Sequence, residues 1–137
     1  MKHFVETFTN QELENTIQIG DRFFMLNRRL EETMKNNNLQ PEYVGAYLGY
    51  TKNDKFVPSF VLLSIIAKIT ERVTVINKKQ EWLFTNNKDL NTKGKTGVKE
   101  GFVIVTNSWK EVLGLGEIKG NRLRNLADVG DFMRREH

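Results

Sequence analysis

Hydrophobic residues are densest between Ser59 and Glu71, where they predict the best-defined helix of the chain. Pro58 suits the first position of this helix, because a backbone N–H would have no partner there. Apolar side chains cover most of the circumference and leave one polar stripe, formed by Ser64, Lys68, Glu71 and Arg72. We expect this helix to be buried between an N-terminal and a C-terminal lobe. The alternative, a membrane-binding or partner-binding helix, is disfavoured because the apolar run is short.

The last third of the chain predicts a β-hairpin. Its first strand, Phe102–Thr106, is apolar on both faces, which is typical of a central strand. A polar turn containing Asn-Ser follows, and the second strand, Val112–Ile118, places Gly114 and Gly116 on one face. Such glycines indicate that another segment or a ligand comes close to the backbone. A packed neighbouring segment is the more ordinary explanation.

Weaker patterns predict the remaining elements. Strands are expected at Arg22–Leu26, Tyr43–Tyr50 and Arg72–Ile76. Helices are expected at Asn10–Ile17, Arg28–Lys35, Gln80–Phe84 and Val129–Arg135. Turns or loops are expected at Gly20-Asp21, at 51–54, at Asn86–Val98 and, as a basic turn, after Ile118.

Three expectations concern side chains in the short helices. The first helix after residue 76 should bury Trp82, Leu83 and Phe84 in the core. Asp128 can cap the last helix through its carboxylate. In that last helix Phe132 and Met133 are expected to face inward, with Arg134 and Arg135 outward.

Charge is unevenly distributed along the 137 residues. Residues 1–44 carry five Lys/Arg and seven Asp/Glu, a net charge of −2, whereas residues 45–137 carry sixteen and ten, a net charge of +6. A basic part beside a slightly acidic part favours a polyanionic partner on one side of the molecule. A solvated lysine-rich surface explains the same charge equally well.

Composition also narrows the class of protein. Without cysteine, the chain has no thiol chemistry, disulfides or cysteine-ligated metals. Its longest apolar run, Phe60–Ala67, is too short to span a bilayer, so no membrane association is expected. The first residues lack the apolar core of a signal peptide, which predicts a cytoplasmic protein.

Catalytic patterns are missing from the sequence. The two histidines, His3 and His137, lie near the two ends, so no internal nucleophile–base pair is available. Gly94-Lys95-Thr96 resembles part of a phosphate-binding loop, but the required preceding glycine is replaced by Asp89. We therefore expect no enzymatic activity, no metal site and no cofactor.

Two basic clusters are the candidate binding residues. Lys88, Lys93, Lys95 and Lys99 surround a glycine-containing loop, and Lys119, Arg122 and Arg124 follow the second strand of the hairpin. Glycine loops let backbone N–H groups approach a phosphate, and the flanking cations supply charge. Arginine can also stack on unpaired bases. The predicted RNA-binding residues are Lys93, Lys95, Lys99, Lys119, Arg122 and Arg124.

From residue 72 onward the sequence resembles the PUA domain, the RNA-binding module named after pseudouridine synthase and archaeosine transglycosylase. Its V-L-G-x-G strand is found at 112–116, and its closing D-x-G-x-[FY]-x-R at 128–134. The chain also resembles the Nip-seven family of large-subunit ribosome-biogenesis factors. This resemblance is carried upstream by 43–52 and by 55–56 followed by a helix, and by 81–84 before the loop. The likeness covers about 43–136 well and 1–42 poorly, where the N-terminal lobe is shorter than is usual in that family.

The resemblance implies an α+β fold, with a small N-terminal α/β (pre-PUA) domain at 1–71 and a PUA-type mixed β pseudobarrel at 72–137. It implies RNA binding without catalysis, with ribosomal precursor RNA as the partner. In that family the RNA-binding face lies in the C-terminal domain. Its basic positions near the last strands correspond here to Lys119, Arg122 and Arg124. Other ribosome-assembly proteins would bind the N-terminal domain. The alternative is an accessory or targeting subunit of an enzyme that modifies transfer or ribosomal RNA.

Overall fold

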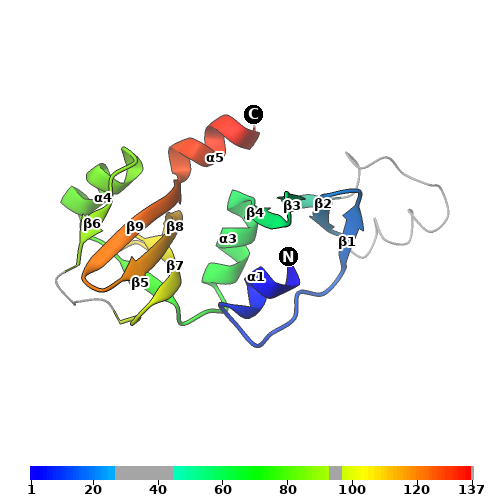
Figure 1. Ribbon diagram of the computed structural model, residues 1–137, viewed down its shortest axis with the longest axis horizontal. Helices are drawn as coiled ribbons and strands as arrows, with labels where there is room; N and C mark the ends of the chain where they lie inside the picture. Colours follow the sequence, from blue (N-terminus) through cyan, green and yellow to red (C-terminus); the bar gives the residue numbers. More distant parts are fainter. Residues whose placement is uncertain (27–44, 93–96, 137) are drawn as a thin grey trace.

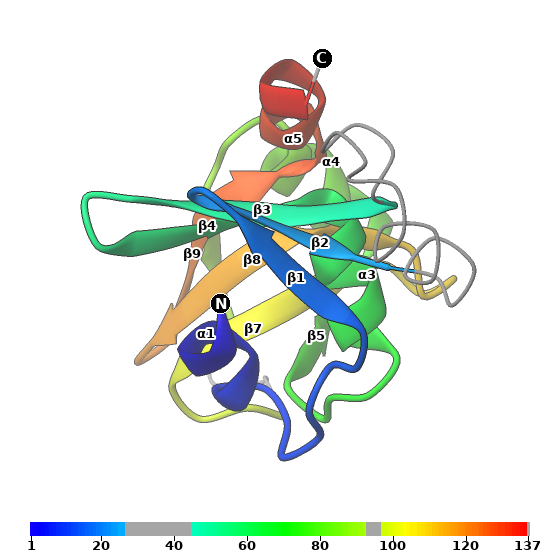
Figure 2. The same cartoon turned by 90° about the vertical axis from the view of Figure 1, so that its right-hand side faces the viewer.

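The computed structural model describes residues 1–26, 45–92 and 97–136, which form two β-sheets with helices between and around them (Figure 1). The first sheet is antiparallel (Figure 2). It contains, in spatial order, β1 (Thr16–Ile19), β2 (Arg22–Met25), β3 (Ala46–Lys52) and β4 (Lys55–Pro58). The second sheet has the order β5-β7-β8-β9-β6. This mixed sheet curls into a half-barrel, so the predicted α+β fold with a pseudobarrel is confirmed.

Tight turns set the register of the first sheet. Gly20, at φ +63°, begins the β1–β2 turn predicted at Gly20-Asp21. Asn53 and Asp54 both have positive φ and close the β3–β4 hairpin, which pairs Lys52 with Lys55. Asn and Asp tolerate this left-handed conformation better than other side chains, which explains their place in the two-residue turn.

The second sheet is built around a central hairpin. Its strands are β5 (Val73–Val75), β6 (Leu90–Asn91), β7 (Gly101–Thr106), β8 (Val112–Lys119) and β9 (Arg122–Asp128). Strand β7 pairs with β8 antiparallel and with β5 parallel, so the prediction that it is central is confirmed. Val103, Ile104 and Val105 are fully buried because both faces of β7 are covered.

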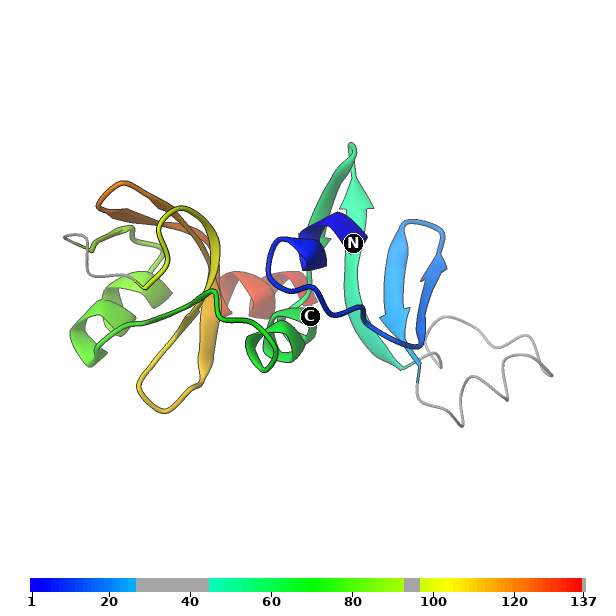
Figure 3. The same cartoon turned by 90° about the horizontal axis from the view of Figure 1, so that it is seen from below.

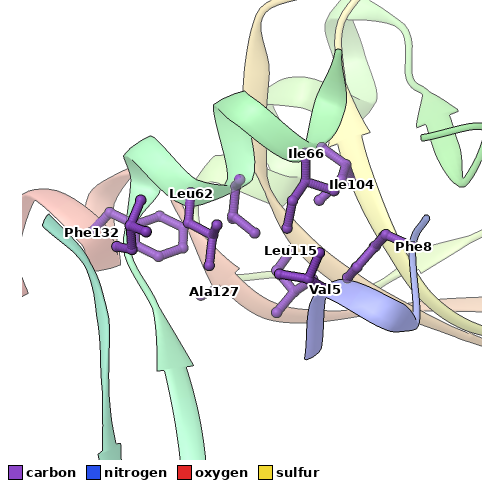
Figure 4. Close-up of a cluster of buried hydrophobic side chains, with 10 residues drawn as sticks. Val5, Phe8, Leu62, Ile66, Ile104, Leu115, Ala127 and Phe132 are labelled. Carbon is purple, nitrogen blue, oxygen red and sulfur yellow. The ribbon is translucent and has the colours of Figure 1, made fainter. Parts of the chain in front are cut away.

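Helix α3 (Phe60–Ala67) packs between the two sheets, as its apolar circumference predicts (Figure 3). Its Leu62, Leu63 and Ile66 are fully buried. They join one core cluster with Leu48 of the first sheet and with Ile104, Leu115 and Ala127 of the second. Figure 4 shows this cluster with Val5 and Phe8, from helix α1 (Lys2–Glu6) and the turn after it. The boundary at Glu71-Arg72 stays a prediction.

The ends of α3 differ from the expectation. Pro58 is the last residue of β4, paired with Gly49, and is not the first residue of the helix. Ser59 caps the helix, because its Oγ accepts a hydrogen bond from the Leu62 N–H at 3.0 Å and donates one to the Tyr47 carbonyl at 2.7 Å. The helix ends at Ala67, four residues before the predicted Glu71.

The expected helix at Asn10–Ile17 is wrong. Residues 16–19 are strand β1, whose Ile17 and Ile19 pack against buried Phe24 and Leu26. Pairing with β2 therefore outweighs the weak local preference. The helix that the structure contains here is α1, which is shorter and lies earlier in the chain. The helix expected at Arg28–Lys35 lies outside the described residues.

The basic turn expected after Ile118 is in fact a two-residue turn, Gly120-Asn121, followed by strand β9. In β9 the side chains of Leu123 and Ala127 are buried, whereas Arg122 and Arg124 are exposed. Strand β6 similarly interrupts the loop expected at Asn86–Val98. Strands β6 and β9 form because they pair with neighbouring strands, since β9 pairs with both β6 and β8.

Two expected core residues lie on the surface. Trp82 of α4 (Lys78–Thr85) is 67% exposed, although Phe84 of the same helix is fully buried. Met133 of α5 (Val129–Glu136) is exposed, although its neighbour Phe132 is buried against Phe60. Successive residues of a helix point about 100° apart, so Met133 points well away from Phe132, and Trp82, two residues before Phe84, lies nearly opposite it.

Candidate nucleic-acid interface

Strands β8 and β9 approach closely where β8 contains its two glycines. A Cβ atom on Gly114 would overlap the Ala127 carbonyl oxygen and lie 2.9 Å from the Asp128 Cα. A Cβ on Gly116 would lie 2.6 Å from the Leu123 side chain. The segment predicted to approach the glycines is therefore β9, which leaves them a packing role.

The closing motif also has a structural role. Asp128 is buried, and its N–H donates to the Asp131 carboxylate at 3.0 Å. The Asp131 N–H donates in return to the Asp128 carboxylate at 3.1 Å, which completes a reciprocal cap on α5. A Cβ on Gly130 would lie 3.1 Å from the same Asp128 carboxylate. The predicted cap is thus present, and α5 is fixed to the end of β9.

The cations predicted from the hairpin lie at the other end of this strand pair. Lys119 and Arg122 are the last cross-strand pair before the Gly120-Asn121 turn, where Gly120 has φ +58°. Arg124 is two residues further along β9, so Arg122 and Arg124 share a face of the strand. All three side chains are exposed, Arg122 to 68%.

Carboxylates accompany each of these cations. Glu117 Oε1 lies 3.8 Å from Lys119 Nζ and 3.3 Å from Arg124 Nη1, while Asp89 Oδ2 lies 3.0 Å from Arg122 Nη2. Exposed ion pairs are weak, at roughly 0–1 kcal/mol, so the cations remain able to exchange these partners for a phosphate. The carboxylates lower the positive potential without blocking access.

Asp89 holds two elements together besides facing Arg122. Its Oδ1 accepts a hydrogen bond from the Asn125 N–H of β9 at 2.8 Å. A hollow of about 440 Å³ opens beside it, lined by Asp89, Leu90, Asn91, Asn121 and Arg122. Arg122 of β9 therefore lines this hollow together with Asp89, which is hydrogen-bonded to the same strand.

The segment between β6 and β7 is anchored at the same end of the sheet. The Thr92 N–H donates to the Asn121 carbonyl at 2.7 Å, and β7 begins at Gly101, opposite Ile118 of β8. Both anchors of the segment between β6 and β7 therefore flank the β8–β9 turn. Lys99, which is exposed, lies in this segment just before β7. Lys93 and Lys95 lie outside the described residues.

Arg72 fixes the segment that presents Lys99. Its Nε donates to the Phe102 carbonyl at 2.9 Å, and its guanidinium also donates to the Glu100 carbonyl. A Cβ on Gly101, which has φ +96°, would lie 3.0 Å from the same guanidinium. We refer to the four described cations gathered here, Lys99, Lys119, Arg122 and Arg124, as the basic end.

Sequence reasoning missed the acidic partners of the basic end. Glu117 lies directly opposite Arg124 in the ladder, a relation that exists only once β9 is recognised as a strand. Asp89 is 33 residues from Arg122 and meets it because β6 pairs with β9. No local spacing signals either pair.

Other chemistry is sparse in the part of the chain that the structure describes. Within 1–26, 45–92 and 97–136, no group of three or more His, Asp or Glu side chains is placed to hold a metal ion. None of the helices in these ranges is long and apolar enough to cross a membrane. A second hollow, of about 520 Å³, lies beside α1, where burial lowers the pKa of the Met1 amino group.

We compared the sequence with protein-family models and with curated proteins. No family model and no curated protein matches the chain. Its function must therefore be inferred from its own residues.

Proposed function

We propose that this chain is a non-catalytic RNA-binding protein that contacts RNA through the basic end. The observation that supports this proposal best is the gathering of Lys99, Lys119, Arg122 and Arg124 at one end of the curled sheet. Lys99 lies just before the β7–β8 hairpin, Lys119 is the last residue of that hairpin, and Arg122 and Arg124 follow in β9. An ordinary solvated surface does not require two anchored turns to meet in this way.

The chemistry of the basic end suits a polyanion with unpaired bases. Lysine contacts a phosphate as a point charge, whereas the planar guanidinium of arginine can fork onto a phosphate or stack on a base. Arg122 lies beside the hollow that Asn121 also lines, and the Asn121 side-chain amide contains both donors and an acceptor. RNA phosphates would compete with Glu117 and Asp89 for the same cations.

The resemblance to the PUA domain and the Nip-seven family supports a more specific proposal. On that ground, the protein acts in assembly of the large ribosomal subunit and binds ribosomal precursor RNA. Its N-terminal domain would contact other assembly proteins. The second candidate is an accessory or targeting subunit of an RNA-modifying enzyme, which the same PUA likeness supports.

Crosslinking the native protein to RNA in cells, followed by sequencing of the RNA, tests the proposal. Enrichment of ribosomal precursor RNA, with assembly factors in the same pull-down, is the expected result. Enrichment of transfer RNA with a modifying enzyme would replace it by the second candidate. Recovery of no RNA above that of an unrelated control protein would contradict both.

A further inference from the structure

The chain's two tryptophans are both displayed on the surface of the second sheet. Trp82 on α4 is 67% exposed, and Trp109 in the β7–β8 turn is 78% exposed. Tryptophan has a large apolar ring, and exposed apolar patches rimmed by polar residues mark interaction sites. Neither ring belongs to a core cluster.

A buried amide bridge holds the two tryptophan-bearing segments together. Asn107, only 4% exposed, donates from Nδ2 to Glu81 of α4 at 3.2 Å and to Glu111 at 2.9 Å. Its Oδ1 accepts from the N–H groups of Trp109 and Glu111, both at 3.0 Å. Trp82 is adjacent to Glu81, so both tryptophans extend from the same hydrogen-bonded bridge. Their backbones are thereby preorganised.

Three lysines and two carboxylates lie around the tryptophans, so lysines are in the majority. Lys78 and Lys79 precede Trp82 by one helical turn and therefore share its side of α4, and Lys110 follows Trp109 directly. All three lysines are exposed. The two nearby carboxylates, Glu81 and Glu111, are engaged by the Asn107 amide. Exposed aromatic rings among lysines are the composition that single-stranded nucleic acids bind.

This surface lies at the opposite end of β7 and β8 from the basic end (Figure 3). Strand β8 has eight residues, so the two turns that it joins are separated by about 25 Å at roughly 3.3 Å per residue. An extended single strand of moderate length can contact both ends at once. A ligand held only at the basic end would not reach the tryptophans.

We propose that Trp82 and Trp109 form a second contact for single-stranded RNA, each ring stacking on an unpaired base while Lys78, Lys79 and Lys110 contact phosphates. This inference rests on the proposed function and specifies its ligand as unpaired RNA that extends along the sheet. A protein partner is the competing occupant. The lysines favour RNA, because a protein interface core is depleted of charged residues around its aromatic anchors.

The test is fluorescence and affinity measurement with an oligouridylate of about 16 nucleotides, a length within the range that one small single-strand-binding domain covers. Trp82→Leu and Trp109→Leu each remove a ring, keep an apolar side chain and leave one tryptophan as reporter. Trp82→Phe and Trp109→Phe retain a stacking ring. Met133→Leu on exposed α5 is the control, and a duplex RNA of equal charge is the control ligand.

Stacking predicts that the oligouridylate quenches each remaining tryptophan and that either leucine variant raises Kd about 5- to 150-fold. The phenylalanine variants should recover most of the affinity, and duplex affinity should not change. Oligouridylate binding without quenching, with the leucine variants unaffected, would overturn this inference and leave the proposed function intact. Wild type that binds neither ligand would overturn both.

Discussion

The two halves of the β8–β9 pair use adjacent residues for opposite purposes. In the half near α5, Gly114 and Gly116 allow the strands and the Leu123 side chain to pack closely, and Asp128 is buried in a cap. In the half near the turn, Lys119, Arg122 and Arg124 are exposed and paired only with surface carboxylates. The same ladder is therefore structural at one end and available for binding at the other.

This comparison separates residues that maintain the fold from residues that are available to bind a ligand. Close packing leaves no room for a ligand at the glycines, so these residues should affect binding only by affecting the fold. The cations make weak contacts within the protein, so their loss should affect a ligand more than stability. The predictions below separate these two kinds of residue, beginning with the largest expected effect.

Ile66→Asp should have the largest effect, because Ile66 of α3 covers the packed half of the pair together with Leu115 and Ala127. A carboxylate there would be buried without a partner, and the free energy of unfolding should fall by about 4 kcal/mol or more. Val61→Asp on the same helix is the control, since Val61 is 40% exposed. Thermal melts of both variants check this. Equal melting temperatures for the two would contradict the packing role of α3.

Gly114→Val should come next. The new Cβ would overlap the backbone of β9 at Ala127, which must then move away from β8. We expect a loss of about 3 kcal/mol, measured by urea denaturation. Gly97→Ala is the control, because among the described residues no atom beyond its chain neighbours lies within 4 Å of an added Cβ, and its φ is not positive. A wild-type unfolding midpoint for Gly114→Val would show that the strands are not closely packed.

Asp128→Ala should have a smaller effect, since it removes one side of the reciprocal cap on α5. A lost cap costs about 1–2 kcal/mol, and the Asp131 N–H would lose its partner. Asp131→Asn keeps an oxygen that can accept from the Asp128 N–H, so it should cost less. Urea denaturation of the two variants compares them directly. A larger loss for Asp131→Asn would be inconsistent with the cap as described.

Much of the packed half could be predicted from sequence because its signals are local. An apolar run that covers a whole helix must be buried, two glycines on one strand face imply a close neighbour, and an aspartate before a short helix can cap it. The structure confirms α3, the β7–β8 hairpin and the Asp128 cap. The resemblance to the PUA pattern depends on the last two of these features, the second strand of the hairpin and the closing motif that begins at Asp128.

The exposed half was harder to predict because its structure depends on pairing. The sequence Arg-Leu-Arg-Asn-Leu-Ala at 122–127 is polar enough to be interpreted as a turn, and β8 makes it a strand. The ion pair of Glu117 with Arg124 follows from that register, and the ion pair of Asp89 with Arg122 follows from the pairing of β6 with β9. Trp82 faces outward because the Asn77 cap and buried Phe84 fix the rotation of α4 about its axis. The order of polar and apolar residues in this helix does not predict that rotation.

A salt titration of RNA binding tests whether the basic end binds RNA phosphates. For single strands, the slope of log K against log salt is about −0.7 for each neutralised phosphate. The test compares wild type with Arg122→Ala/Arg124→Ala and with Lys52→Ala/Lys55→Ala. The second double variant removes the same charge from the exposed β3–β4 turn of the first sheet.

Both double variants change the net charge equally. Any difference between them in RNA affinity or salt dependence therefore depends on where the removed charges lie. The account predicts that Arg122→Ala/Arg124→Ala binds more weakly and loses up to about 1.4 units of slope, with a melting temperature close to that of wild type. Lys52→Ala/Lys55→Ala should keep the wild-type slope. Equal slopes and affinities for the two variants would contradict the assignment of the basic end.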